Sequence, residues 1–277
     1  MADPIPVDFI PLAMIIGIFT IFMIIVTILA ALRHREKRTQ VTKTLLVMYV
    51  LFIVANGIGL VTAIFGILGI PAIRFVSEIS AFLGDRLVLV LINTFFAQFE
   101  LVFFLVGFYF MFVFAQLVFG DANAPQQIRG KLVKILIEIA IVLQSLASIL
   151  VGYSMILAIA GSPIIEVIIL LGATILPIVV LVIQMPFVLL TMIPIFIESN
   201  RARHRISRDD PHRSNFLYLA IMAFILLLTP IFTVLLIAIS LSGVPYPNFA
   251  AYLTWVVEPL TIYAGYRGFF SRKSPGT

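Results

Sequence analysis

The chain has 277 residues, of which 62% are hydrophobic and only 11% are charged, and its mean hydropathy is +1.19. Soluble domains carry about 25% charged residues, so this composition excludes a protein that must cover its whole surface in water. The net charge of +5 does not indicate a nucleic-acid partner, because the basic residues are clustered at the ends of apolar runs.

Seven apolar runs predict an all-α polytopic membrane protein, a single seven-transmembrane-helix bundle with no soluble domain. Each run has at least the roughly 20 residues that cross a bilayer. The fifth run is the longest and contains three prolines, so we expect it to be kinked. In chain order the predicted helices cover about 9–32, 43–69, 86–118, 131–160, 163–197, 214–242 and 248–268.

The distribution of basic residues predicts the orientation in the membrane. Of the 18 Lys and Arg residues, 16 lie after the first, third and fifth runs or at the C-terminus, which share one side of the membrane. Only Arg74 and Arg86, between the second run and the start of the third, lie on the other side. Basic residues concentrate on the cytoplasmic side of membrane proteins, so we expect the N-terminus outside and the C-terminus in the cytoplasm. The expected location is the cell (plasma) membrane. The other basic residues are Arg33, Arg35, Lys37, Arg38, Lys43, Arg129, Lys131, Lys134, Arg201, Arg203, Arg205, Arg208, Arg213, Arg267, Arg272 and Lys273.

Several chemistries are excluded by what the apolar runs lack. Cysteine is absent, which excludes disulfides and thiolate metal sites. His34, His204 and His212 lie in basic segments, so histidine ligation of haem or metal at membrane depth is not expected. No helix core holds a lysine for a retinal Schiff base, and we expect no cofactor. HExxH, GxSxG and P-loop motifs are also missing, so an enzyme is the least expected class.

Two carboxylates near the middle of apolar runs are the main candidates for function. A charge at the bilayer centre costs about 2.5–3.5 kcal/mol, so such residues usually face the bundle interior. Helical spacing places further polar side chains on the same faces, and a small-residue stretch of the second run adds an asparagine. The predicted ligand- or ion-binding residues are Glu258, Glu100, Asn93, Asn56, Thr254, Trp255 and Thr261.

Three functional interpretations of these carboxylates remain open at this point. They could share a proton, form a sodium-like ion site, or act as counter-ion for a cationic ligand. The structural alternative is a protonated glutamate that hydrogen-bonds across helices. Prolines in the later runs would loosen the backbone nearby, and the predicted hinges are Pro177, Pro186, Pro230 and Pro259.

An arginine-rich stretch follows the fifth run. Arg201, Arg203, Arg205 and Arg208 are predicted to contact anionic lipid, which attracts each basic residue by roughly 1 kcal/mol. Docking of a cytoplasmic partner protein is the alternative.

Three short segments carry a resemblance to a known family. They are the basic first turn 33–39, the Thr229-Pro230 step, and the stretch 258–263 with sequence Glu-Pro-Leu-Thr-Ile-Tyr. Together with the seven-helix topology they resemble class A G-protein-coupled receptors and rhodopsin-like proteins. In the last segment Glu258 stands where that family has asparagine, and Tyr263 is one residue further from the proline. The resemblance implies a receptor-like fold with a central cavity.

The sequence therefore favours a receptor-like or sensor-like protein that binds a small ligand, ion or proton in a central cavity. One alternative is a transporter or channel for protons, cations or small solutes, in which the same carboxylates would carry the ion. Another is a non-catalytic subunit of a membrane complex. The predicted partners are the lipid bilayer and a cytoplasmic protein at the basic loops, with the oligomeric state left open.

Overall fold

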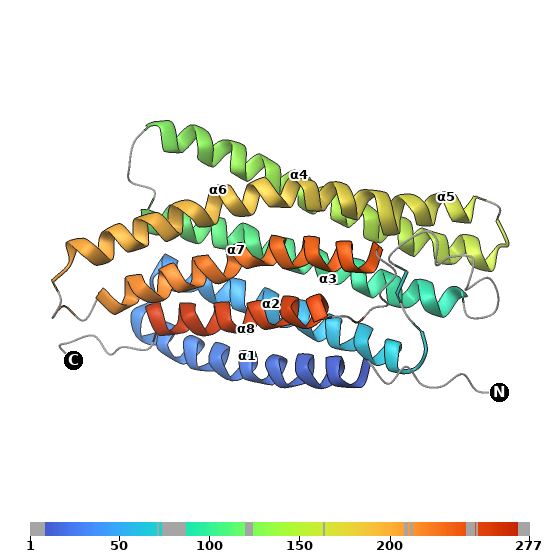
Figure 1. Ribbon diagram of the computed structural model, residues 1–277, viewed down its shortest axis with the longest axis horizontal. Helices are drawn as coiled ribbons and strands as arrows, with labels where there is room; N and C mark the ends of the chain where they lie inside the picture. Colours follow the sequence, from blue (N-terminus) through green and yellow to red (C-terminus); the bar gives the residue numbers. More distant parts are fainter. Residues whose placement is uncertain are drawn as a thin grey trace.

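A computed structural model gives the fold, and every regular element that it describes is helical (Figure 1). It describes residues 9–70, 72–73, 87–119, 124–162, 164–207, 210, 213–241, 247 and 249–270. The elements are α1 (Phe9–Lys37), α2 (Gln40–Ile67), α3 (Leu87–Phe119), α4 (Ala124–Ile159), α5 (Ile165–Ile169), the π-helix η2 (Leu170–Ile175), α6 (Leu176–Arg205), α7 (Arg213–Leu241) and α8 (Phe249–Phe269). Because α5, η2 and α6 are continuous, the described chain forms seven helical rods, and the predicted all-α bundle is confirmed.

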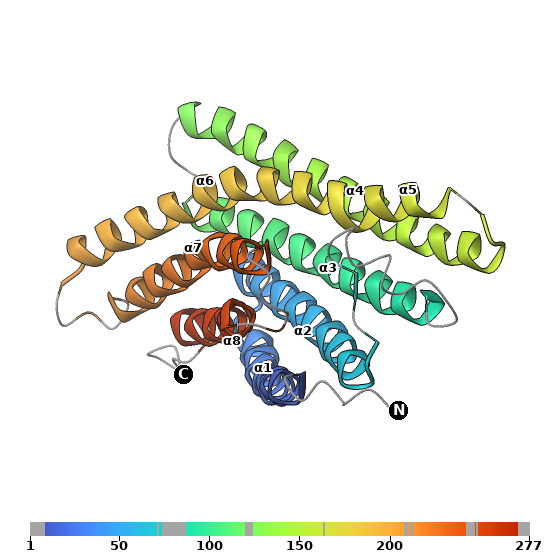
Figure 2. The ribbon, with the colours of Figure 1, turned by 45° about the vertical axis from the view of Figure 1, so that its right-hand side comes forward.

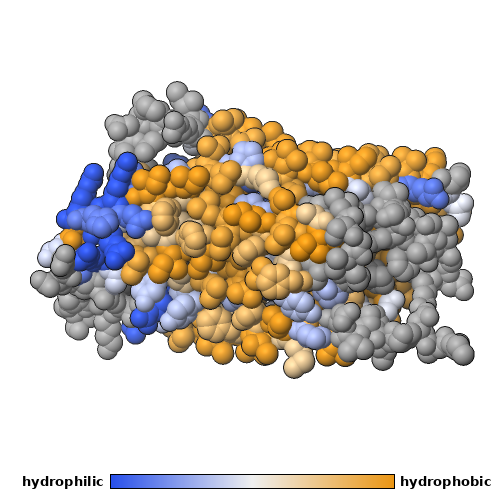
Figure 3. Space-filling view, viewed as in Figure 1, coloured by the Kyte–Doolittle hydropathy of each residue, from blue (hydrophilic) through white to orange (hydrophobic). Residues whose placement is uncertain are grey.

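The rods form a ring in which neighbours in sequence are neighbours in space (Figure 2). Helix α1 packs against α2 and closes the ring against α8, and α4 packs against α6. Successive rods run in opposite directions, as short connections require. Alternation brings the basic residues together at one end. Figure 3 shows strongly hydrophilic surface at that end, on the left. This basic end is defined by the described residues Arg33, Arg35, Arg38, Lys43, Lys131, Lys134, Arg201, Arg203, Arg205, Arg213 and Arg267; the opposite end is called the far end.

Within the part of the chain that the structure describes, six helices are long and apolar enough to cross a membrane. Their outward faces carry exposed aliphatic side chains, such as Ile18 and Val142, which are 61% and 65% exposed. A surface this apolar needs lipid rather than water around it. Helix α8 is not among the six, although it has 21 residues. Glu258, Pro259 and its tyrosines lower the hydropathy of α8.

The fifth predicted run differs from its prediction in two ways. It is interrupted by η2, in which the Leu176 N–H donates to the carbonyl of Leu171, five residues earlier. Pro177 follows directly and has no N–H to donate, which explains why the regular helical ladder is broken here. The helix also continues to Arg205 instead of ending near 197, so three of the four predicted arginines lie on α6 and not in a loop. Arg208 lies outside the described residues.

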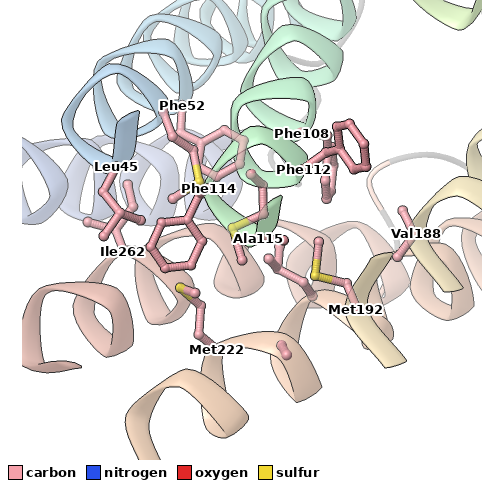
Figure 4. Close-up of a cluster of buried hydrophobic side chains, with 14 of the residues drawn as sticks. Leu45, Phe52, Phe108, Phe112, Phe114, Ala115, Val188, Met192, Met222 and Ile262 are labelled. Atoms are coloured by element: carbon pink, nitrogen blue, oxygen red, sulfur yellow. The ribbon is translucent and has the colours of Figure 1, made fainter. Parts of the chain in front are cut away.

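The main hydrophobic core takes buried side chains from all seven rods. Figure 4 shows a part of it that α2, α3, α6, α7 and α8 form. Aromatic rings dominate it: Phe52 lies 5.4 Å from Phe104 and 6.0 Å from Phe108, between ring centroids. Phe108 in turn contacts Phe187 of α6 at 6.3 Å. These rings pack edge to face or tilted, the geometry that aromatic pairs prefer.

Candidate functional site

The candidate site is centred on Glu258, in the middle of α8. Its side chain is only 3% exposed, and Asn56 of α2 is completely buried beside it. The Asn56 amide Nδ2 donates hydrogen bonds to the Glu258 carboxylate and to the carbonyl of Phe52, the latter at 3.1 Å. Among the described residues, Asn56 Oδ1 is buried and has no hydrogen-bond partner. The structure thus brings together two residues that lie 202 positions apart and were both predicted for the site.

The packing of α8 on α2 holds this pair in place. Trp255 lies against Gly59 on the far-end side of the pair, where a Cβ on the glycine would overlap the indole ring. On the basic-end side, Gly265 lies against the hydroxyl of Tyr49 in the same way. Together with the Asn56–Glu258 hydrogen bond, these two contacts keep one antiparallel register along both helices. Two glycines therefore let the helices approach closely enough for the buried amide to reach Glu258.

Glu100 of α3 lies close to this pair. Gly107 of α3 packs on Phe52 of α2, and one heptad further toward the far end the same antiparallel register places Glu100 level with Gly59. Glu100 is partly exposed, unlike Glu258, and the two carboxylates interact electrostatically. The acidic groups therefore form a column, with Glu100 about one helical turn nearer the far end.

Toward the basic end, Glu258 is closed off by the aromatic core. Tyr49, Phe52, Phe108, Met222 and Ile262 have no exposed surface. Figure 4 shows most of these side chains, from α2, α3, α7 and α8, pointing toward one another. Close packing of this kind leaves no polar path for an ion between Glu258 and the basic end through these residues.

The remaining predicted site residues are placed differently. Thr254 and Thr261 flank Glu258 by about one turn on either side, and each hydroxyl donates to a carbonyl of its own helix four residues earlier, at 2.9 and 2.8 Å. Asn93 is not part of this cluster. Its Nδ2 donates to the carbonyl of Ile70 at 2.7 Å, so it ties α3 to the chain just after α2.

Two buried hydroxyl groups, one on α2 and one on α7, were not predicted from the sequence. Tyr49 Oη and Thr229 Oγ1 both lack a hydrogen-bond partner among the described residues. For Thr229 a signal was present, because Thr229-Pro230 on α7 repeats the polar-residue-proline step of Glu258-Pro259 on α8. For Tyr49 no local pattern separates it from an ordinary tyrosine at a membrane surface.

The predicted arginine surface lies at the basic end of α6. A shallow depression of about 480 Å³ runs along one face of the helix, apolar toward the middle of the bundle and basic toward its end. Arg201 in this depression also pairs with Glu198, with 2.6 Å between Nη1 and Oε1. The lining residues are Phe196, Ile197, Asn200, Arg201, His204 and Arg205.

Comparison with protein-family models, curated proteins and solved structures found no match. No family is therefore shown for this chain. The similarity to heptahelical receptors rests on topology and short segments alone, and the interpretation of the site depends on its own geometry.

Proposed function

We propose that the chain is a seven-span membrane protein of receptor or sensor type, with α8 as the seventh span. Helix α8 packs along α7 and α1 like the other rods, and Glu258 of the candidate site is one of the residues that lower its hydropathy. Ionisable residues inside a span are costly and usually functional. The basic end would face the cytoplasm by the positive-inside rule, which puts the N-terminus outside. The plasma membrane is the proposed location.

The signal would be a small ligand, ion or proton that occupies the acidic column of Glu258 and Glu100. One observation carries this proposal: the column is closed toward the basic end by fully buried aromatic and aliphatic side chains, while Glu100 is partly exposed. A conducting channel needs a polar path to both sides at once, whereas a sensor needs access from only one. A carrier opens its site to one side at a time, and ion flux separates it from a sensor.

Occupancy would act on the helices that carry the site. An occupant that binds one arrangement of α2, α7 and α8 more tightly shifts the population toward it. Pro230 and Pro259 lie in α7 and α8 next to the site, and Pro186 lies in α6, so these helices can bend where a ladder hydrogen bond is missing. The change would reach the basic end, where Arg201, Arg203 and Arg205 meet lipid or a partner protein.

Ion flux into proteoliposomes tests the proposal. Wild type, Glu258→Gln and Glu138→Gln would be compared for proton and sodium flux under an imposed gradient. Glu138 is a matched control, because it is an exposed glutamate paired with Lys134 at 3.6 Å on α4. The proposal predicts that all three proteins leave flux at the level of empty liposomes.

A flux that Glu258→Gln abolishes and Glu138→Gln retains would identify a transporter or channel and overturn the sensor proposal. Absence of flux supports the sensor proposal only if a cooperative melting transition shows that the protein is folded in the same lipid.

A further inference from the structure

We propose that Glu258, Asn56 and Thr229 form a binding site for a monovalent metal cation of the sodium class, with one oxygen ligand from each of α8, α2 and α7. This inference rests on the proposed function and names the occupant of its site. Thr229 is the new member.

The register of α7 on α8 places Thr229 at the site. Met222 Sδ lies 3.1 Å from the position that a Cβ on Gly265 would take, so these two residues face each other. One heptad toward the far end, the same two faces carry Thr229 and Glu258. The same relation between α2 and α8 is observed directly. Tyr49 faces Gly265, and one heptad further toward the far end Asn56 contacts Glu258. A layer of Tyr49, Gly265 and Met222 is therefore followed, toward the far end, by a second layer. Its members are Asn56, Glu258 and Thr229.

Two oxygen atoms of this second layer are buried and unsatisfied within the part of the chain that the structure describes. Asn56 is fully buried and Thr229 is 2% exposed, and Asn56 Oδ1 and Thr229 Oγ1 have no hydrogen-bond partner among the described residues. Leaving a buried polar atom unpaired costs about 1–3 kcal/mol. A cation shared with the Glu258 carboxylate would satisfy both oxygens at once.

The prolines supply further oxygens at the same level. Pro230 and Pro259 have no N–H, so the carbonyls of Leu226 and Trp255 receive no hydrogen bond from the residue four positions later. Helical carbonyls point toward the C-terminal end of their own helix. Because α7 and α8 are antiparallel, both freed carbonyls point toward the layer of Thr229 and Glu258.

The charge of the site fits a single positive charge. No Lys, Arg or His occurs in 44–73, 88–128 or 214–266, the stretches that include the middle of α2, α3, α7 and α8. The described residues hold no group of three or more His, Cys, Asp or Glu side chains that could bind a metal ion. Glu258 is the one carboxylate among the three proposed ligands, and Glu100 lies about one turn away. One liganding carboxylate with neutral oxygens suits a hard monovalent ion better than a divalent one, which prefers several carboxylates.

The only tryptophan of the chain makes the test direct, because Trp255 lies against Gly59 beside the site. Full-length protein in lipid nanodiscs would be titrated with sodium chloride at constant ionic strength, with choline chloride as the balance, and tryptophan emission recorded. Sodium is expected to change the emission saturably and choline is not. Thr229→Val should weaken sodium binding roughly tenfold, the equivalent of about 1.4 kcal/mol, and Glu258→Gln should abolish it.

Thr233→Val is the matched control, because Thr233 lies one turn further along α7 and its hydroxyl donates to the Thr229 carbonyl at 2.9 Å. It should bind sodium like the wild type.

A sodium response unchanged in Thr229→Val would remove Thr229 from the site. A wild type that ignores sodium but responds to pH would make the occupant a proton; the same titration with Glu100→Gln and Tyr49→Phe identifies the titrating group. The first result overturns the three-residue site, and the second overturns a metal cation as its occupant. Neither result is an ion flux, so the sensor proposal, which the flux measurement tests separately, stays in place.

Discussion

Single residues decide how closely α8 approaches α2. Asn56 and Glu258 could be predicted from the sequence as interior polar residues, because their position in apolar runs makes exposure to lipid costly. Their contact could not be predicted, since it depends on the register that Gly59 and Gly265 allow through packing. The sequence of a membrane helix does not show whether an aromatic ring from another helix lies against a given glycine.

Gly59 and Gly57 provide a matched pair for this claim. A Cβ on Gly59 would overlap the Trp255 ring, whereas a Cβ on Gly57 meets nothing within 4 Å. Gly59→Ala should therefore lower the free energy of unfolding by about 1–3 kcal/mol through overpacking. Gly57→Ala should leave it unchanged or raise it by roughly 0.5–1 kcal/mol through helix propensity.

Both variants would be measured by thermal unfolding in the same detergent, with tryptophan emission as a second readout. Equal stability of the two variants, or an unshifted emission in Gly59→Ala, would contradict the close contact between α2 and α8.

At the scale of helices, buried amides connect α3 to α4. Gln144 Nε2 donates to Gln98 Oε1 at 2.7 Å and to the Gln98 carbonyl at 3.1 Å, and both side chains are buried. The existence of each helix followed from its apolar run. The end of α6 did not, because hydropathy stops at the arginines while Arg and Ala continue to favour helix. The π-helix could be predicted only as a kink near Pro177, since sequence does not specify which hydrogen-bond register replaces the broken one.

A double-mutant cycle on Gln98→Ala and Gln144→Ala tests the α3–α4 connection. Hydrogen bonds between membrane helices average about 0.6 kcal/mol and reach about 1.7 kcal/mol. We expect a coupling free energy in that range from the four unfolding measurements. Additive effects of the two substitutions would mean that the amides do not stabilise the packing of α3 on α4.

The whole molecule is an alternating ring of helical rods whose basic residues gather at one end (Figure 3). The sequence predicted this arrangement because the spacing of apolar runs and basic segments is a global pattern that survives errors of several residues at each helix end. The layer of Asn56, Glu258 and Thr229 could not be predicted from the sequence, because its members come from helices far apart in the chain.

Orientation can be tested with single cysteines, because the natural chain has none. Ser207→Cys and Arg267→Cys lie at the basic end, and Ala160→Cys at the far end; all three positions are exposed. In intact cells a membrane-impermeant maleimide should label only Ala160→Cys, and the other two should react after permeabilisation. Labelling of Arg267→Cys from outside would contradict α8 as a seventh span, and labelling of Ser207→Cys would reverse the orientation.

The central claim is that Glu258 belongs to a binding site and is not merely a structural link. The most direct measurement is the melting temperature of wild type and Glu258→Gln across sodium concentrations and pH values. An occupant at one hundred times its Kd stabilises the protein by about 2.7 kcal/mol. We expect the wild-type melting temperature to move by several degrees with one of these variables and the variant to stay constant. A variant that follows the wild type, or a wild type that responds to neither variable, would contradict the claim.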